Sequence, residues 1–222
     1  IAAMRSGRTC PHEMALKDFF VNPKRPRELE DKFSIEVKSQ GITDQKQSGR
    51  CWLFTGLNVL RAQLMAREQS GKFFFSQNYG FFWDQLEKAN LFLEGIIETR
   101  KASDEDKKVE WLFKHPLSDG GQFTGISDIL SKYGVVPAEV MPETASSNDT
   151  RLMGQIITRT QRQTGMALRK AAAKGESLAQ LRERKEACLK QVYRILSLNL
   201  GEPPTSFSYT LRNAKGEAIS TD

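Results

Sequence analysis

The sequence predicts an α+β protein in which helices dominate. Leu53, Leu57, Leu60 and Leu64 recur at spacings of four, three and four residues, which is the stripe of an amphipathic helix that begins near Cys51. Residues 150–200 are also mostly helical in pattern, whereas residues 33–38 alternate apolar and polar side chains as a short half-buried strand does. Hydrophobic residues make up 39% of the 222, which is enough to build a core.

The elements before residue 150 follow from capping and breaking residues. Residues 1–32 are polar and basic and carry three prolines, so they predict an N-terminal arm with short helical pieces. Ser76 is placed to cap a helix over 77–97, and a further helix over 104–114 is stopped by Pro116. The glycine turn at 119–122 leads into a helix that ends at Gly134.

Glycine and proline also divide the C-terminal third. Gly165 and Gly175 predict breaks in the helical stretch, and Pro203-Pro204 ends it. Residues 213–216 carry a turn signal, so we expect the tail to form a hairpin that the chain leaves unfinished or barely finishes.

Positive charge is concentrated in one stretch of the chain. The formal net charge is +6, and residues 158–194 hold ten basic residues against three acidic ones, so the remainder is close to neutral. Such a face can attract nucleic acid or an acidic partner, but on helices it is more often a solvated surface or a subunit contact. Nucleic-acid binding ranks last among the candidate functions, because no RNA- or DNA-binding motif accompanies the charge.

Apolar runs and cysteines indicate the compartment. No apolar run approaches the roughly 18 residues that a membrane span needs, and residues 1–10 lack the apolar segment of a secretory signal. Cys10, Cys51 and Cys188 are widely spaced and odd in number, so a disulfide framework is not expected. We therefore expect a cytoplasmic protein that does not associate with membranes.

The segment from Gly41 to Trp52 carries the chemistry; it reads Gly-Ile-Thr-Asp-Gln-Lys-Gln-Ser-Gly-Arg-Cys-Trp. Cys51 would stand in the first turn of the leucine-striped helix, where unpaired amide N–H groups and the helix macrodipole favour a nucleophilic thiolate. Gln45 lies six residues earlier and can bring its side-chain amide back to the same helix end. With the Cys51 backbone N–H, it would form an oxyanion hole. The alternative is that Cys51 is simply a small buried residue.

This segment resembles the active-site segment of papain-like cysteine peptidases. In that family a glutamine precedes the nucleophilic cysteine by this spacing and an aromatic residue follows it. Ser48 stands where extracellular papains carry a disulfide cysteine, and Arg50 replaces the usual small residue. Both departures match the intracellular bleomycin hydrolase / aminopeptidase C branch.

The resemblance extends over nearly the entire chain, through landmarks in the order of the family. They lie at residues 76–79, 82–84, 87–90, 119–122, 132–137 and 200–204. The Gly120-Gly121 turn resembles the segment of the papain-like fold whose backbone pairs with the extended substrate. Glycine suits this substrate-binding role because a side chain would block close approach of the main chain. A turn that only caps the following helix is the alternative.

Two partners of a papain-like nucleophile are missing from the pattern. Such a thiolate needs a histidine as its base and a third group, usually asparagine, to orient the imidazole. His12 precedes Cys51, and His115 follows it by 64 residues, whereas papain-like enzymes place the histidine about 130–150 residues later. Asn199 has no matching context either. We therefore expect the catalytic His and Asn to lie beyond Asp222.

The resemblance implies four parts. Residues 1–32 form an arm, 33–149 the helical left-hand domain of the papain-like fold with the nucleophile helix, 150–202 a helical insertion, and 203–222 the start of a hairpin or a linker to a C-terminal half. The sheet side of the fold is then largely missing. The chain could be a truncated form, a proteolytic fragment, a degenerate copy or one piece of a two-chain protein.

The function that the resemblance implies is that of a cysteine aminopeptidase, acting on peptide or amide bonds through a thioester acyl-enzyme. Cys51 would attack and Gln45 would stabilise the oxyanion; no metal or organic cofactor is required. Members of this branch form hexamers with inward-facing active sites, and a C-terminal arm limits access. The basic insertion would then contribute to subunit contacts or to the channel wall. The competing hypothesis is an inactive structural or binding module.

Overall fold

The computed structural model describes residues 32–35, 37 and 41–219. The chain divides into two units, residues 1–38 and 39–222, and the helices of the described residues belong to the second. The expected strand at 33–38 is wrong where it can be checked, because residues 33–35 and 37 form bends or irregular backbone. Alternation alone does not make a strand, since a strand also needs a partner to pair with.

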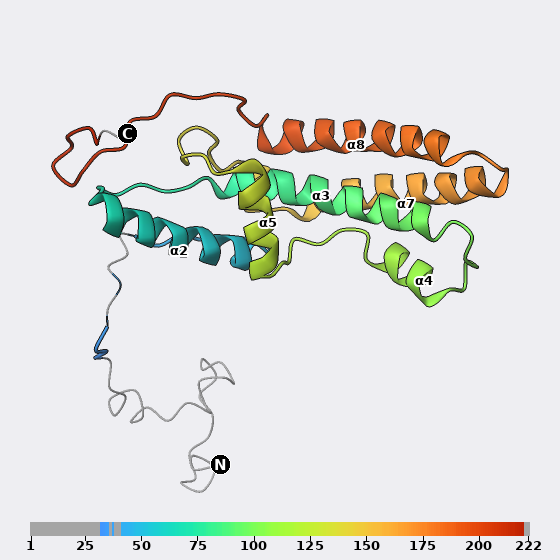
Figure 1. Ribbon diagram of the computed structural model, residues 1–222, viewed down its shortest axis with the longest axis horizontal. Helices are drawn as coiled ribbons and strands as arrows, with labels where there is room; N and C mark the ends of the chain where they lie inside the picture. The colour runs from blue at the N-terminus through green and yellow to red at the C-terminus, as the bar shows by residue number, and fades with distance from the viewer. Residues whose placement is uncertain (1–31, 36, 38–40, 220–222) are drawn as a thin grey trace, which may run out of the picture. The chain divides into compact units, whose positions relative to one another are not determined.

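The described residues are mainly helical (Figure 1), with β-pairing limited to isolated bridges in the part of the chain that the structure covers. This agrees with the expected helical side of the predicted fold. The helices are α2 (Cys51–Glu68), α3 (Gln77–Glu98), α4 (Lys107–Lys114), α5 (Phe123–Tyr133), α6 (Ala145–Asn148), α7 (Arg151–Ala173) and α8 (Leu178–Leu200). The helix starts expected near Cys51 and after Ser76 are confirmed, as is the helix end at Gly134.

Helix α3 is the centre of the fold. It packs against α2, α4, α5, α7 and α8, and in Figure 1 it lies alongside α7 and α8 while α5 crosses it steeply. Phe81, Phe82, Leu93 and Ile96 of α3 are completely buried. Burying large apolar side chains contributes about 1.5–3 kcal/mol each, so α3 supplies much of the core.

Capping residues explain where the helices begin. The Ser76 hydroxyl accepts a hydrogen bond from the Tyr79 N–H at 3.0 Å, and the Asp106 carboxylate accepts from the N–H groups of Lys108 and Val109. Ser177 and Gln180 form a reciprocal capping box at the start of α8. These caps satisfy amide groups that would otherwise lack partners.

One of the two predicted helix breaks is wrong. Gly175, with φ of +89°, separates α7 from α8 as expected, but Gly165 lies inside the continuous helix α7. A Cβ at Gly165 would come within 3.1 Å of the rings of Phe92 and Phe113. Glycine therefore allows close packing of α7 against α3 and α4. The helical backbone is retained at Gly165 because this packing compensates for the low helix propensity of glycine.

Helices α7 and α8 pack on α3 within the same unit as the rest of the core. The division of the chain into a domain at 33–149 and an insertion at 150–202 stays a prediction, because the packing by itself marks no border at residue 150.

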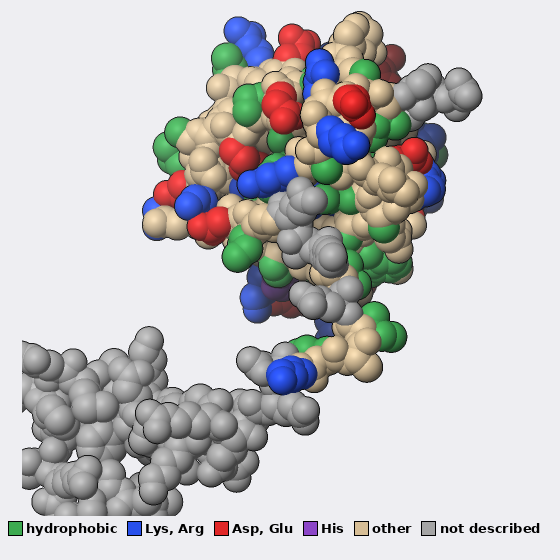
Figure 2. Space-filling view, turned by 90° about the vertical axis from the view of Figure 1, so that its left-hand side faces the viewer, with side chains coloured by type: hydrophobic (Ala, Val, Ile, Leu, Met, Phe, Trp, Pro, Cys, Tyr) green, Lys and Arg blue, Asp and Glu red, His purple; other side chains and the backbone are tan. Residues whose placement is uncertain are grey.

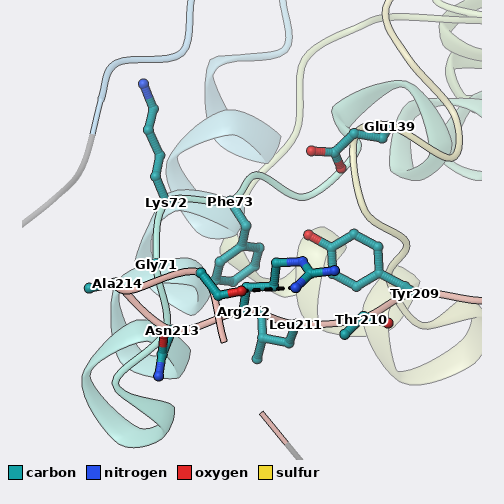
Figure 3. A pocket seen from close by; sticks show the side chains of 11 residues that line it. Gly71, Lys72, Phe73, Glu139, Tyr209, Thr210, Leu211, Arg212, Asn213 and Ala214 are labelled. Atoms are coloured by element: carbon teal, nitrogen blue, oxygen red, sulfur yellow. Dashed lines mark hydrogen bonds between the residues drawn. The ribbon is translucent and has the colours of Figure 1, made fainter. Parts of the chain in front are cut away.

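The tail returns to the linker between α2 and α3. The Gly71 N–H donates to the Arg212 carbonyl at 2.7 Å, and Ser70 and Asn213 form an isolated antiparallel β-bridge. The tail itself turns at 213–216, with the Asn213 N–H bonded to the Glu217 carbonyl, which agrees with the expected short hairpin. Linker and tail, together with Glu139, line an open pocket of about 560 Å³ that Figure 3 shows from close by; Cys51 does not line it.

Gly71→Val should displace the tail. A Cβ at this position would lie 2.8 Å from the Asn213 carbonyl oxygen, a backbone atom that cannot rotate away. We expect a loss of about 1–3 kcal/mol in the free energy of unfolding, measured by urea denaturation. Gly154→Ala is the matched control, because nothing lies within 4 Å of its Cβ and the residue is helical. An equal loss in both variants would contradict this account.

Candidate active site

Cys51 is the first residue of α2, and its side chain is exposed. The N–H groups of Leu53 and Phe54 both donate to the Arg50 carbonyl at 3.0 Å, so the helix starts at this point. Behind Cys51, the side chains of Trp52, Leu53 and Phe54 are buried. The thiol therefore sits at the solvent-facing amino end of a helix that buries one face, and the alternative of a buried structural cysteine at position 51 is wrong.

The structure brings Cys51 and Gln45 together. Both line one pocket of about 510 Å³, whose other lining residues are Ile42, Thr43, Asp44, Phe54, Thr55 and Asn58. The Asn58 side-chain amide donates to the Thr43 hydroxyl at 2.8 Å, which ties the loop to α2. The side-chain oxygen of Gln45 is buried without a partner among the described residues. Gln45 and Cys51 thus share one pocket, and the role of Gln45 as an oxyanion donor stays a prediction.

An ion pair between buried Arg50 and solvent-accessible Glu143 lies behind the segment between these two residues. Arg50 is fully buried, and its guanidinium donates to both carboxylate oxygens of Glu143, at 3.1 and 2.8 Å. Its Nε donates to the Ser48 hydroxyl at 2.8 Å, and this hydroxyl donates to the Gln45 carbonyl at 2.6 Å. The loop and the helix start are therefore connected by side chains as well as by the backbone.

The Gly120-Gly121 turn is exposed and lies beside Trp52. The Trp52 indole N–H donates to the Asp119 carbonyl at 2.8 Å, and the Gly49 N–H donates to the Asp119 carboxylate at 3.2 Å. The turn is thereby attached to the residues on both sides of the Arg50-Cys51 pair. Its role as a substrate-binding segment stays a prediction.

Lys88 of α3 fixes the turn from the other side. Its ammonium group donates to the carbonyls of Ser118 and Gly120 at 2.9 and 2.7 Å, and it pairs with the Asp84 carboxylate. Burial raises the pKa of the Asp84 carboxyl, and the attraction of Lys88 opposes that shift. The sequence provided no signal for this contact beyond the position of Lys88 in a family landmark.

Gly121→Ala should destabilise this arrangement. An added Cβ would lie 2.6 Å from Cε2 of Trp52, whose ring is buried and held by its hydrogen bond to Asp119. We expect a loss of about 1–3 kcal/mol, measured by denaturant unfolding. In Gly120→Ala the added Cβ meets only the Ser118 hydroxyl, at 3.3 Å, so a much smaller loss is expected there. A larger loss of stability in Gly120→Ala than in Gly121→Ala would contradict the close contact between position 121 and the Trp52 ring.

Neither His115 nor Asn199 lines the Cys51 pocket. His115 ends α4, where its Nδ1 lies 3.1 Å from the Trp111 carbonyl oxygen, and it does not line the Cys51 pocket. Asn199 lies on α8, where its amide donates to the Ile195 carbonyl. His12 and Cys10 fall outside the described residues. Among the described residues, the pocket that Cys51 and Gln45 share is lined by no histidine.

Two further findings concern metal binding and membrane-spanning helices in the described residues. They contain no cluster of three or more His, Cys, Asp or Glu side chains that could hold a metal ion. None of the helices in that part of the chain has the length and apolar character required to cross a membrane.

The helical fold, with a cysteine at the exposed start of its buried helix, defines a papain-like protein. The chain belongs to the Peptidase C1-like family, whose model matches residues 7–220. PepW from Lactobacillus rhamnosis HN001 (DR20) has a solved structure that matches with a TM-score of 0.87 at 36% identity, covering 97% of this chain and 47% of that one.

Curated relatives agree with this assignment. Aminopeptidase C of Listeria monocytogenes serovar 1/2a is 40% identical over 196 residues, which are 88% of this chain and 44% of the relative. Aminopeptidase W of Lactobacillus delbrueckii subsp. lactis is 37% identical over 212 residues, which are 96% of this chain and 46% of the relative. The chain therefore spans less than half the length of these relatives and corresponds to their N-terminal part.

Proposed function

We propose that this chain carries the nucleophile of a cysteine aminopeptidase of the bleomycin hydrolase / aminopeptidase C type. The observation that carries the proposal is the exposed thiol of Cys51 at the amino end of α2, in one pocket with Gln45. The names of the relatives, aminopeptidases C and W, support removal of residues from the N-terminus of a peptide.

In the proposed reaction, the Cys51 sulfur attacks the carbonyl carbon of the first peptide bond. The oxyanion that forms is stabilised by the Gln45 side-chain amide and the Cys51 N–H. The C–N bond then breaks, the amine leaves with a proton from a histidine, and water hydrolyses the remaining thioester. We propose that this histidine and its orienting asparagine belong to the C-terminal half that the relatives possess.

We further propose that the protein acts in the cytoplasm, needs no cofactor and assembles into a homo-oligomer, a hexamer by family resemblance. Leu152 on α7 and Leu198 on α8 are large exposed apolar side chains that an assembly would cover. Sedimentation velocity on the intact protein tests this, and a monomer at micromolar concentration would contradict it.

Nucleic-acid binding through the basic stretch remains the weaker alternative to this proposal. Several cations of the basic stretch are engaged in ion pairs: Arg169 with Asp104, Arg182 and Lys185 with Glu94, and Arg184 with Glu176. Figure 2 shows another face of the molecule, on which basic and acidic side chains are interspersed. Paired and mixed charges of this kind do not form a continuous track for phosphates.

The test compares two fluorogenic substrates in the intact protein that contains this chain. One is an aminoacyl-aminocoumarin with a free amine, and the other is its N-acetylated form. We expect turnover of the first only, and loss of that turnover when Cys51 is alkylated with iodoacetamide. No turnover of either substrate would favour an inactive binding module, and turnover of both would contradict the N-terminal selectivity.

A further inference from the structure

We propose that Arg50 and Ser48 are positioning residues that hold the oxyanion donor Gln45 in register with Cys51, with Glu143 as their anchor. The inference rests on the proposed function of the site. Neither residue touches the reacting atoms; both act by fixing the backbone that carries Gln45.

The anchor is the ion pair between Arg50 and Glu143. Arg50 has no exposed surface, and its guanidinium lies 5.0 and 5.2 Å from the ring centres of Phe54 and Phe81. A buried guanidinium is retained only when its charge is compensated, and a bidentate carboxylate does so with a defined geometry. The Ser147 hydroxyl in α6 donates to Glu143 at 2.7 Å and orients the carboxylate in turn.

The remaining hydrogen bond of Arg50 reaches the Gln45 loop. Its Nε can only donate, so the Ser48 hydroxyl oxygen must accept this bond, at 2.8 Å. The single hydroxyl proton of Ser48 is then available for the Gln45 carbonyl, 2.6 Å away. The direction of both bonds is thus determined, and the chain Glu143–Arg50–Ser48–Gln45 has one arrangement. Because Arg50 also precedes Cys51, a single ion pair positions the nucleophile and the oxyanion donor together.

A second attachment keeps the loop folded when this chain of bonds is cut. Gln47 forms a parallel bridge with Asp149, in which the Gln47 N–H donates to the Asn148 carbonyl at 2.9 Å. Loss of the Ser48 hydroxyl would leave this bridge and the Arg50–Glu143 pair in place. Ser48→Ala should therefore allow the backbone at Gln45 to vary more in position without unfolding the loop.

The kinetic test uses the intact protein and four forms: wild type, Ser48→Ala, Gln45→Ala and the double variant. We expect Ser48→Ala to lower kcat about 10-fold, with KM changing less than about 2-fold, because a displaced oxyanion donor weakens the transition state only. In the Gln45→Ala background the same substitution should have no further effect. Ser48→Thr, which keeps the hydroxyl, should restore most of the kcat.

Ser146→Ala is the matched control, since the Ser146 hydroxyl is half-buried and donates to Asn199 at 2.9 Å, outside this chain of bonds. Its kcat should equal that of wild type. Equal losses for Ser48→Ala in both backgrounds would show a merely structural role and would overturn the proposal.

Hydrogen exchange separates this proposal from the proposed function. In Ser48→Ala, amides of residues 41–49 should exchange at least about 5-fold faster, while those of α7 and α8 stay unchanged. If the wild type lacks Cys51-dependent turnover, the proposed function fails, but the exchange result still decides whether Ser48 holds the loop. Unchanged exchange in residues 41–49 would overturn the positioning role directly.

Discussion

Cys51→Ser should lower kcat/KM of the intact protein by at least about 10³-fold, because a serine hydroxyl at this position has no base strong enough to replace the thiolate chemistry. The fold should be unaffected, since the Cys51 side chain is exposed at the start of α2. The measurement is turnover of the free-amine aminoacyl-aminocoumarin, together with thermal unfolding of both proteins.

Cys188→Ser is the matched control for this experiment. Cys188 is 4% exposed in the core, and burial raises the pKa of its thiol, so it is neither accessible nor reactive. This variant should keep kcat and lose about 1–3 kcal/mol of stability, because a more polar hydroxyl replaces the thiol at a buried position. Retained turnover in Cys51→Ser, or lost turnover in a folded Cys188→Ser, would remove Cys51 from the nucleophile role.

Glu143→Ala should destabilise the protein by about 3–5 kcal/mol, because it leaves the Arg50 charge buried and unpaired. The two partners are not equivalent: the Arg50 side chain has no exposure, whereas the Glu143 side chain is 28% exposed. Replacing Arg50 by methionine frees a carboxylate that water can still reach, so a smaller loss is expected for Arg50→Met. Urea denaturation of the three proteins measures the difference.

Glu98→Ala is the control for the ion-pair effect. Glu98 pairs with Lys108 at 3.7 Å, and both side chains are more than half exposed, so its loss should change stability by less than about 0.5 kcal/mol. A Glu143→Ala loss as small as that of Glu98→Ala would mean that the Arg50 charge is not buried in solution.

Local patterns predicted the helices correctly where caps and apolar stripes coincide. The leucine stripe after Cys51, the Ser76 cap and the Gly134 terminus all lie where the sequence indicates. The strand at 33–38 and the break at Gly165 were wrong, because both depend on what the segment packs against. Gly165 remains helical because α7 packs at this position against the rings of Phe92 and Phe113, which occupy the space where a side chain would be.

The sequence predicted the two central residues of the candidate site, but not the residues that contact and hold them. Cys51 and Gln45 are recognisable because their chemistry and spacing lie within one short segment. Glu143, which holds that segment, is 93 residues from Arg50, and Lys88, which holds the glycine turn, is 32 residues from Gly120. No spacing rule connects such pairs, since only folding brings them together.

The sequence by itself determined the family, the start of the nucleophile helix and the identity of the proposed nucleophile and amide donor. The tertiary structure alone decided that the thiol is exposed, that Gln45 shares its pocket, and that buried Arg50 pairs with Glu143. The physical reason is that helix starts and reactive groups are encoded by neighbouring residues. Burial, by contrast, depends on contacts between segments that are distant along the chain.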